Sequence, residues 1–216
     1  MESIIILFFQ LAILLMSVVI HEFSHGWMAY RLGDPTAKYL GRLTLNPIKH
    51  LDFVGSFLLP LAIFVFSGGR AIFGWAKPVP FNPYNLRDQR FGPAKVAIAG
   101  PGANLLIALI FGLILRFMSS NAFGLSVLQG ESGLIQIFSL IVFLNILLAV
   151  FNLVPIPPLD GSKIIFAVLP HSLENIRIFL ERYGLFILLF FIFFAFQLIF
   201  PIIFSIYYLI VGQFPL

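Results

Sequence analysis

Long apolar stretches alternate with short polar intervals along this chain. Four of these stretches are long enough to cross, as helices, a hydrocarbon core about 30 Å thick. They cover residues 3–20, 92–118, 134–155 and 183–212. The first has no Lys or Arg before it and no small-residue cleavage site after it, so we expect it to be retained. The pattern predicts an all-α polytopic membrane protein with about four transmembrane helices.

A fifth apolar stretch, residues 51–67, is marginal in length for a span and is interrupted by a glycine and a proline. Gly68 and Gly69 then turn the chain toward a proline-containing segment that ends at Pro80 and cannot be a helix. We expect a re-entrant element here, in which a helix enters the bilayer and extended chain returns. Such backbone is tolerated at membrane depth only where protein or water covers it.

The polar intervals are too short to hold a second folded domain. The longest have only about 20 to 30 residues, so residues 1–216 are expected to form a single membrane-embedded domain. Residues 36–45 contain β-forming residues in rough alternation and end at Asn46-Pro47. This pattern predicts a short β-strand or hairpin near the membrane surface.

The C-terminal part of the chain allows more than one arrangement. Residues 162–182 mix apolar and charged residues around Pro170, as in short interfacial helices or in a plain polar loop. Residues 183–212 would be about 45 Å long as one helix, which exceeds the bilayer core. This stretch therefore tilts, projects or kinks at Pro201, as one membrane segment or as two.

The composition supports the membrane assignment and narrows the chemistry. Hydrophobic residues make up 60% of the chain, charged residues only 10%, and the mean hydropathy is +1.04, far from the balance of soluble proteins. Because the chain has no Cys, any metal site must use His, Asp or Glu ligands. The net charge is +4, but the Lys and Arg residues are scattered over short loops. This distribution favours contact with the lipid bilayer and not with nucleic acid.

The first span runs without a break into His21-Glu22-Phe23-Ser24-His25. Histidines at positions i and i+4 lie on one helical face, where both imidazoles can reach one ion. Glu22 follows His21 directly, where its carboxylate could take a proton from a metal-activated water. Ionisable groups in a membrane helix are costly, so three of them within five residues indicate a functional site. The alternative is that they simply mark a helix end at the interface.

A catalytic zinc usually takes three protein ligands and leaves a fourth position for water. His21 and His25 supply two of the three. Asp160 is the acid near the end of another span, and it follows prolines that break the helix beginning near Leu134. Loosened backbone at membrane depth normally lines a cavity. Asp160 is therefore predicted to be the third ligand, with an N-cap of the following helix as the alternative.

These motifs resemble those of the site-2 proteases, in particular the small form without PDZ or CBS domains. The matching elements are His21-Glu22-Phe23-Ser24-His25, Gly100-Pro101-Gly102-Ala103-Asn104, the segment Asn152 to Gly161, and the segment Gly74 to Pro80. The resemblance extends from the first span to about residue 165. It implies intramembrane cleavage of transmembrane proteins, with two His and one Asp on zinc. It also implies that Glu22 is the general base and that Asn104 lies near the scissile carbonyl.

Two asparagines in the apolar spans have alternative interpretations. An amide inside a span needs hydrogen-bond partners, so Asn104 could join helices, helped by Gly100 and Gly102 nearby. With the resemblance, a catalytic contact with the oxyanion or the substrate backbone is favoured. Asn152 is expected either to join helices or to bind substrate. His50 lacks ligand spacing and is expected at the surface.

The three ligands require the first span and the span 134–155 to end on the same side of the membrane. This holds only if residues 51–67 do not cross. Every Lys and Arg except Arg116 then lies on one side, which the positive-inside rule makes cytoplasmic. The active site is therefore expected near the cytoplasmic side of the cell membrane.

Two classes of function fit these ligands. The first is zinc-dependent hydrolysis of a peptide bond within or near a transmembrane segment of a membrane protein. The alternative is a zinc transporter or metal-binding membrane protein. Glu22 between the ligands favours the protease, and transport would need polar groups toward the far side, where the spans are almost purely apolar. A substrate helix must unwind before cleavage, and residues 36–45 could then capture it by β-addition.

Overall fold

The computed structural model describes residues 2–52, 55, 58, 62, 65, 77–119 and 132–213. In chain order its elements are the helices α1 (Glu2–Arg31) and α2 (Thr36–Tyr39), the turns η1 (Pro47–His50) and η3 (Pro83–Asn85), the helices α4 (Gly92–Ser119), α5 (Ser132–Asn152) and α6 (Asp160–Val168), the turn η6 (His171–Leu173), the helix α7 (Glu174–Phe190), the turns η7 (Phe191–Ala195) and η8 (Phe196–Ile199), and the helix α8 (Phe200–Val211).

Four helical stretches are long and apolar enough to cross a membrane. They are Leu7–Arg31, Gly92–Met118, Gly133–Asn152 and Glu174–Val211. These stretches correspond to the four predicted spans, and the part of the chain that the structure describes contains helices and no strands. The prediction of a helical multi-pass membrane protein is therefore confirmed. The re-entrant element predicted for residues 51–67 lies largely outside the described residues.

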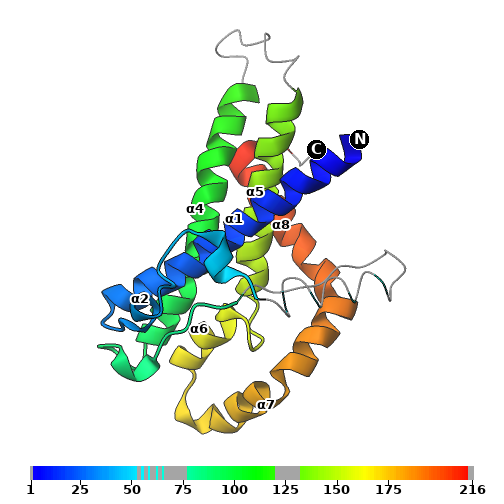
Figure 1. Ribbon diagram of the computed structural model, residues 1–216. Coiled ribbons are helices and arrows are strands. Elements are labelled where there is room, and N and C mark those ends of the chain that lie inside the picture. Colours follow the sequence, from blue (N-terminus) through cyan, green and yellow to red (C-terminus); the bar gives the residue numbers. More distant parts are fainter. Residues whose placement is uncertain are drawn as a thin grey trace.

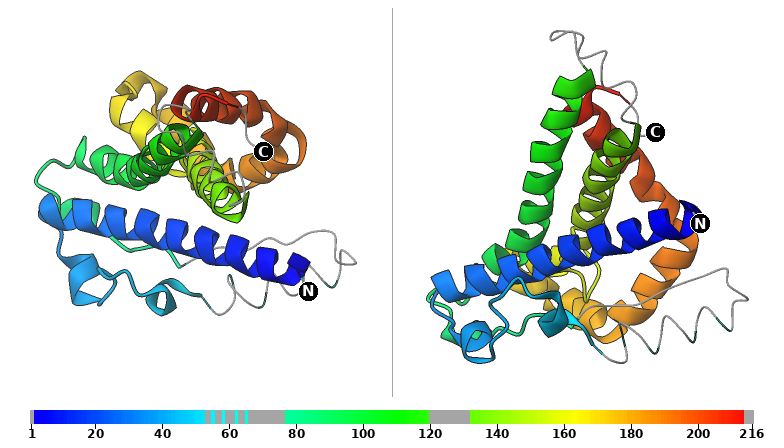
Figure 2. Two further views of the ribbon diagram at one scale, coloured as in Figure 1. Left: turned by 90° about the horizontal axis from the view of Figure 1, so that it is seen from above. Right: turned by 45° about the horizontal axis from the view of Figure 1, so that its top comes forward.

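The central helix of the fold is α4, which contacts α1, α5, α6 and α8. α4 and α5 run side by side with α8 packed against both (Figure 1). α1 crosses this group obliquely and lies along one side of it when seen from above (Figure 2). As a result, α4 contacts both the helix that carries His21 and His25 and the helix that begins at Asp160.

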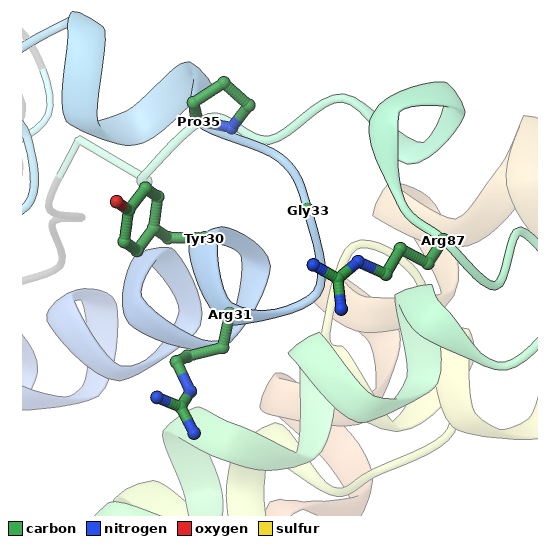
Figure 3. A pocket seen from close by; sticks show the side chains of 5 residues that line it. All are labelled: Tyr30, Arg31, Gly33, Pro35 and Arg87. Atoms are coloured by element: carbon green, nitrogen blue, oxygen red, sulfur yellow. The ribbon is translucent and has the colours of Figure 1, made fainter.

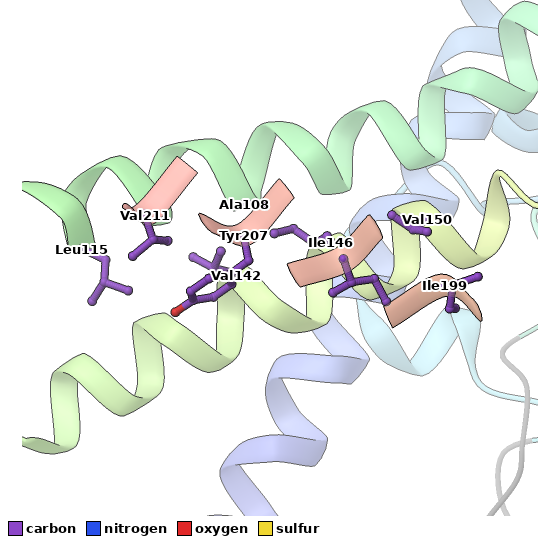
Figure 4. Close-up of a cluster of buried hydrophobic side chains, with 9 residues drawn as sticks. Ala108, Leu115, Val142, Ile146, Val150, Ile199, Tyr207 and Val211 are labelled. Atoms are coloured by element: carbon purple, nitrogen blue, oxygen red, sulfur yellow. The ribbon is translucent and has the colours of Figure 1, made fainter. Parts of the chain in front are cut away.

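Buried side chains from α4, α5, η8 and α8 form the apolar core (Figure 4). They are Ala108, Leu115, Val142, Ile146, Val150, Ile199, Ile203, Tyr207 and Val211. Gly112 allows α8 to approach closely, because a Cβ there would lie 2.4 Å from Cγ2 of Ile210. Lipid chains are as apolar as these side chains, so dense packing and not the removal of water holds the helices together.

The last span is interrupted in its middle. The π-helical turn η7 and the 3-10 turn η8 separate α7 from α8. Pro201 lies in the first turn of α8, where its missing N–H breaks no helical hydrogen bond. Of the arrangements expected for this stretch, a change of helix type is present, but in the turns that precede Pro201 and not at the proline itself. At the far end, Arg116 of α4 donates from Nη1 to the carbonyl of Leu209 at 3.2 Å, which caps the C-terminus of α8.

The strand predicted for residues 36–45 is wrong. Thr36–Tyr39 form the single-turn helix α2, and Gly41 follows in a left-handed conformation with φ of 64°. The reason lies in Asp34, whose Oδ1 accepts hydrogen bonds from both the backbone N–H and the hydroxyl of Thr36. This local bonding favours a helical turn, and it overrides the weak β-preference of the alternating sequence.

Two further expectations concern the polar intervals. Residues 162–182 belong to α6, η6 and α7, so the short helices are confirmed and the plain loop is wrong. His50 is fully buried and not at the surface. Its Nε2 lies 2.8 Å from the carbonyl oxygen of Thr44, and its own carbonyl accepts from the N–H of Lys77 at 2.9 Å. Both partners belong to segments that pack around η1. The polarity of His50 alone does not reveal this packing.

Candidate metal centre

His21, His25 and Asp160 come together although 139 positions separate His21 from Asp160. The Nε2 atoms of His21 and His25 are 3.0 Å apart. Asp160 Oδ2 lies 3.2 Å from Nε2 of His21 and 3.0 Å from Nε2 of His25. All three side chains are buried. Three potential ligand atoms thus form a nearly equilateral triangle inside the protein.

The size of this triangle fits a zinc ion. Zinc–nitrogen and zinc–oxygen bonds of about 2.0–2.1 Å place tetrahedral ligand atoms about 3.3 Å apart. The observed separations of 3.0–3.2 Å are close to this value. The three residues can therefore occupy one face of a zinc tetrahedron and leave the fourth position open.

The tautomers of both histidines support the same interpretation. His21 Nδ1 lies 2.6 Å from Asn104 Oδ1, and His25 Nδ1 lies 2.7 Å from the carbonyl oxygen of Val96. Both oxygens only accept hydrogen bonds, so each Nδ1 carries a proton, and each ring in its neutral form presents an Nε2 lone pair. Two lone pairs and the Asp160 carboxylate then face one another without a hydrogen between them. This arrangement is stable with a cation at its centre.

The amide of Asn104 has a fixed orientation. Its Nδ2 donates to the carbonyl of Ser17 at 3.3 Å and to Oδ1 of Asn145 at 2.8 Å. Asn145 in turn donates to the hydroxyl of Ser17 at 3.0 Å. Because the Ser17 carbonyl can only accept, Oδ1 must be the atom that faces His21. The network therefore joins α1, α4 and α5 behind the ligand His21.

Sequence reasoning did not identify Asn145. It is fully buried within α5 and holds Asn104 in place. The rule that singled out Asn104, an amide within an apolar span, applies equally to Asn145 and could have found it.

Gly100 of α4 lies directly against the two imidazoles. A Cβ at this position would lie 2.4 Å from His25 Nε2 and 2.7 Å from His21 Nε2. No other residue type fits there without moving the ligands. The glycine explains how α4 can pack so closely on the metal centre.

Asp160 is the first residue of α6, and the alternative that it caps this helix is wrong. The cap position belongs to Leu159. Oδ2 of Asp160 faces the histidines, while Oδ1 accepts from Lys163 Nζ at 3.2 Å. Burial alone would raise the pKa of Asp160, but the two imidazoles beside its carboxyl group and the charge of Lys163 lower it below its usual value. The group is therefore a carboxylate, the form that binds metal.

Glu22 and Asn152 have partners outside the triangle. Glu22 is half-buried, and its Oε2 accepts a hydrogen bond from the backbone N–H of Val79 at 2.7 Å. Asn152 donates from Nδ2 to the carbonyl of Leu148 within its own helix at 2.9 Å. The structure thus brings His21, His25 and Asp160 together, with Asn104 against His21, whereas the side-chain amide of Asn152 donates within its own helix.

A separate pocket of about 520 Å³ lies beyond the ligands, at the C-terminal end of α1 (Figure 3). It is lined by Tyr30, Arg31, Gly33, Pro35 and Arg87. None of these residues is a ligand or contacts the His–Asp triangle through a hydrogen bond described above. This open, basic pocket is therefore separate from the buried triangle.

Comparison with known proteins identifies relatives of the chain. The profile of Peptidase family M50 matches residues 9–195. YwhC of Bacillus subtilis, named as a zinc metalloprotease, is 42% identical over 177 residues, which cover 82% of this chain and 76% of YwhC. Rip2 of Mycolicibacterium smegmatis, also named as a zinc metalloprotease, is 34% identical over 148 residues, or 68% of this chain.

More distant relatives carry the same type of name. The zinc metalloprotease MJ0392 of Methanocaldococcus jannaschii is 27% identical over 157 residues. The matched part spans 52% of Rip2 and 33% of MJ0392, so these relatives are considerably longer than the region they share with this chain. No solved structure matches the chain.

Proposed function

The chain belongs to Peptidase family M50, and on this premise we propose which bond it cleaves and which side chains carry the reaction. It is a zinc metalloprotease, and its resemblance to the site-2 proteases is confirmed. The proposed substrates are membrane proteins, cleaved within or near a transmembrane segment. The observation that carries this proposal is the convergence of His21, His25 and Asp160 next to Glu22, on helices long enough to cross a bilayer.

His21, His25 and Asp160 are the proposed zinc ligands. When bound, zinc supplies the Lewis acidity that makes water nucleophilic near neutral pH and polarises the scissile carbonyl. Glu22 is the proposed general base. It accepts the proton of the attacking water and delivers a proton to the amine nitrogen as the C–N bond breaks.

Asn104 is proposed to act through His21. Its Oδ1 holds the Nδ1–H of His21, and both hydrogens of its Nδ2 are engaged by Ser17 and Asn145. This bonding favours a role in fixing the ligand's tautomer and direction. The contact with a scissile carbonyl that the sequence favoured would require Nδ2 to leave one of these partners.

Asn152 is the amide we propose for contact with the substrate backbone. Its Nδ2 donates within α5, and among the described residues its Oδ1 accepts no hydrogen bond. The amide oxygen of Asn152, near the chain that leads to Asp160, could accept an N–H from an unwound substrate. Capture by a strand at residues 36–45 has no support, because α2 occupies that segment.

The zinc-transport alternative is less well supported. Glu22 has no role in that alternative, and the matched relatives are named as proteases. The active site is proposed to face the cytoplasm, because Lys and Arg residues concentrate on the side where the ligand helices end.

A direct test is purification in detergent, metal analysis, and incubation with a panel of transmembrane peptides. We expect one zinc per chain and cleavage of at least one peptide within or next to its apolar segment. A chain that carries zinc, moves it across vesicles and cleaves no transmembrane substrate would contradict the proposal.

A further inference from the structure

The segment from Lys77 to Asn82 runs along the C-terminal half of α1 and is fixed at both ends. The N–H of Lys77 donates to the carbonyl of His50 at 2.9 Å. The N–H of Asn82 donates to Oδ2 of Asp34 at 2.6 Å. Between these two points, the N–H of Val79 donates to Oε2 of Glu22 at 2.7 Å. Glu22, the proposed general base, is therefore hydrogen-bonded to a backbone segment that further hydrogen bonds hold on both sides of this contact.

Proline flanks Val79 on both sides, in the order Pro78-Val79-Pro80. Proline has no backbone N–H and restricts its own φ and the conformation of the preceding residue. Val79 thus carries the one backbone donor of this tripeptide, on a chain held extended by its neighbours. That donor is directed at the carboxylate of Glu22.

The side chain of Val79 also packs against the face of α1 that carries Glu22. Glu22 and Gly26 are four residues apart on α1 and so share one face of the helix. Val79 is buried, and a Cβ on Gly26 would lie 2.9 Å from its Cγ1. The absence of a side chain at Gly26 lets Val79 settle on the helix one turn beyond Glu22.

We propose that Val79 is a positioning residue that acts through Glu22. Its N–H holds Oε2 of Glu22 and thereby leaves Oε1 as the oxygen that accepts the proton from the attacking water. This inference rests on the proposed function of Glu22 as general base. It gives a role to the Pro-Val-Pro segment, to which the sequence alone assigned none.

A pair of substitutions separates the N–H from the side chain. Val79→Pro removes the N–H and keeps a residue suited to extended chain, while Val79→Ala keeps the N–H and shortens the side chain. Loss of a group that orients a catalytic side chain typically costs roughly 10- to 100-fold in activity. We expect Val79→Pro to lower kcat by that factor, with KM and zinc content unchanged, and Val79→Ala, which loses only the packing on Gly26, to lower kcat by much less.

A second pair of variants tests how the side chain of Val79 packs against Gly26 of α1. Gly26→Ala places a methyl group against Cγ1 of Val79, which pushes the segment away from Glu22. We expect a lowered kcat with zinc retained. Adding Val79→Ala removes Cγ1 and should restore much of the kcat, which a merely destabilising effect of Gly26→Ala would not allow.

Hydrogen exchange measures the contact without any assay of proteolysis. In protein labelled with 15N-valine, the Val79 amide signal can be assigned by its absence in Val79→Ala. Glu22→Ala should speed exchange of this amide by roughly tenfold or more, as loss of a bond to a charged acceptor implies. Ser24→Ala is the matched control, since the hydroxyl of Ser24 donates to the carbonyl of Ile20 in its own helix.

The results separate the positioning role of Val79 from the proposed protease function on which it rests. If Val79→Pro retains zinc and cleaves at the wild-type rate, the positioning role is wrong while the protease assignment stands. If Glu22→Ala leaves the exchange of Val79 unchanged, the hydrogen bond itself is refuted. If wild-type protein cleaves nothing, the proposed function fails, and the exchange result still decides whether Val79 holds Glu22. Should Val79→Pro misfold, an ester in place of the Val79 amide removes the donor with the side chain intact and must give the same loss of kcat.

Discussion

Gly100 sits where a side chain would collide with two proposed zinc ligands. A methyl group on its Cα would lie within 2.4–2.7 Å of the Nε2 atoms of His25 and His21. These atoms bear the lone pairs that must face the metal. We therefore predict that Gly100→Ala loses most of its zinc together with its activity, as measured by metal analysis of purified protein.

Gly102→Ala provides the matched control on the same helix. A Cβ at Gly102 meets no heavy atom within 4 Å. This variant should keep zinc and activity, because alanine is also a better helix former than glycine. Full zinc occupancy in Gly100→Ala would contradict the geometry of the centre.

At the scale of single residues, the sequence singled out the proposed ligands His21, His25 and Asp160, which the structure brings together, but not all of the groups that orient them. The i, i+4 spacing of His21 and His25 is a local property of one helix, so it can be read directly. The groups that orient them are Asn104 and the carbonyl of Val96, which come from α4. Their identity depends on how two helices pack, and a backbone carbonyl leaves no trace in a sequence.

Among the elements, the connection after α1 depends on Asp34. This carboxylate is fully buried and accepts hydrogen bonds from Thr36, Asn82 and Asn85. It joins α2 to the segment that passes over Glu22. Burial raises the pKa of Asp34, but the hydrogen bonds from Thr36, Asn85 and Asn82 outweigh it and lower this pKa below the usual value.

Asp34→Asn should lower the thermal stability of the protein. An amide offers one acceptor oxygen, so at least one N–H donor would face its NH₂ group, at a cost of about 1–3 kcal/mol. Because the pKa of Asp34 is lowered on folding, its stabilisation is present above the unfolded pKa and is lost as the pH falls through the folded pKa. The difference in Tm between wild type and Asp34→Asn, measured on metal-free protein, should be constant near neutral pH and shrink below about pH 4. A difference that grows on acidification would show that another group is responsible.

The same residue explains why one element was mispredicted. Residues 36–45 do contain β-forming residues in rough alternation, but a strand also needs a partner strand to pair with. The hydrogen bonds from Thr36 to Asp34 instead begin a helical turn. In contrast, the spans 92–118 and 134–155 were predicted within a few residues, because a bilayer requires apolar helices of about this length. The first and last helical stretches extend further, to Arg31 and from Glu174, into polar sequence that hydrophobicity does not mark.

For the whole molecule, the ligand geometry restricts the topology. Asp160 meets His21 and His25, and in the topology we propose α1 and the chain after α5 therefore reach the centre from the same side of the bilayer. The N–H of Arg87 also donates to the carbonyl of Leu32 just after α1, at 3.0 Å. The segment between Leu32 and Arg87 therefore begins and ends on the same side of the molecule.

Labelling of single cysteines can test this topology, because the chain has none of its own. Lys38→Cys and Arg87→Cys are both predicted to react with a membrane-impermeant reagent from the cytoplasmic face. A cysteine in the loop between α4 and α5 should react from the opposite face. Opposite sidedness of positions 38 and 87 would contradict the topology and with it the shared zinc site.

The central claim is that zinc and Glu22 together hydrolyse peptide bonds, and Glu22→Gln tests it most directly. Glutamine is nearly isosteric with glutamate and still accepts from the Val79 N–H, but it cannot take the proton from water. We predict full zinc content, an unchanged Tm, and cleavage of a transmembrane substrate reduced by about 10²–10⁴. Equal cleavage by wild type and Glu22→Gln at full zinc occupancy would contradict the account.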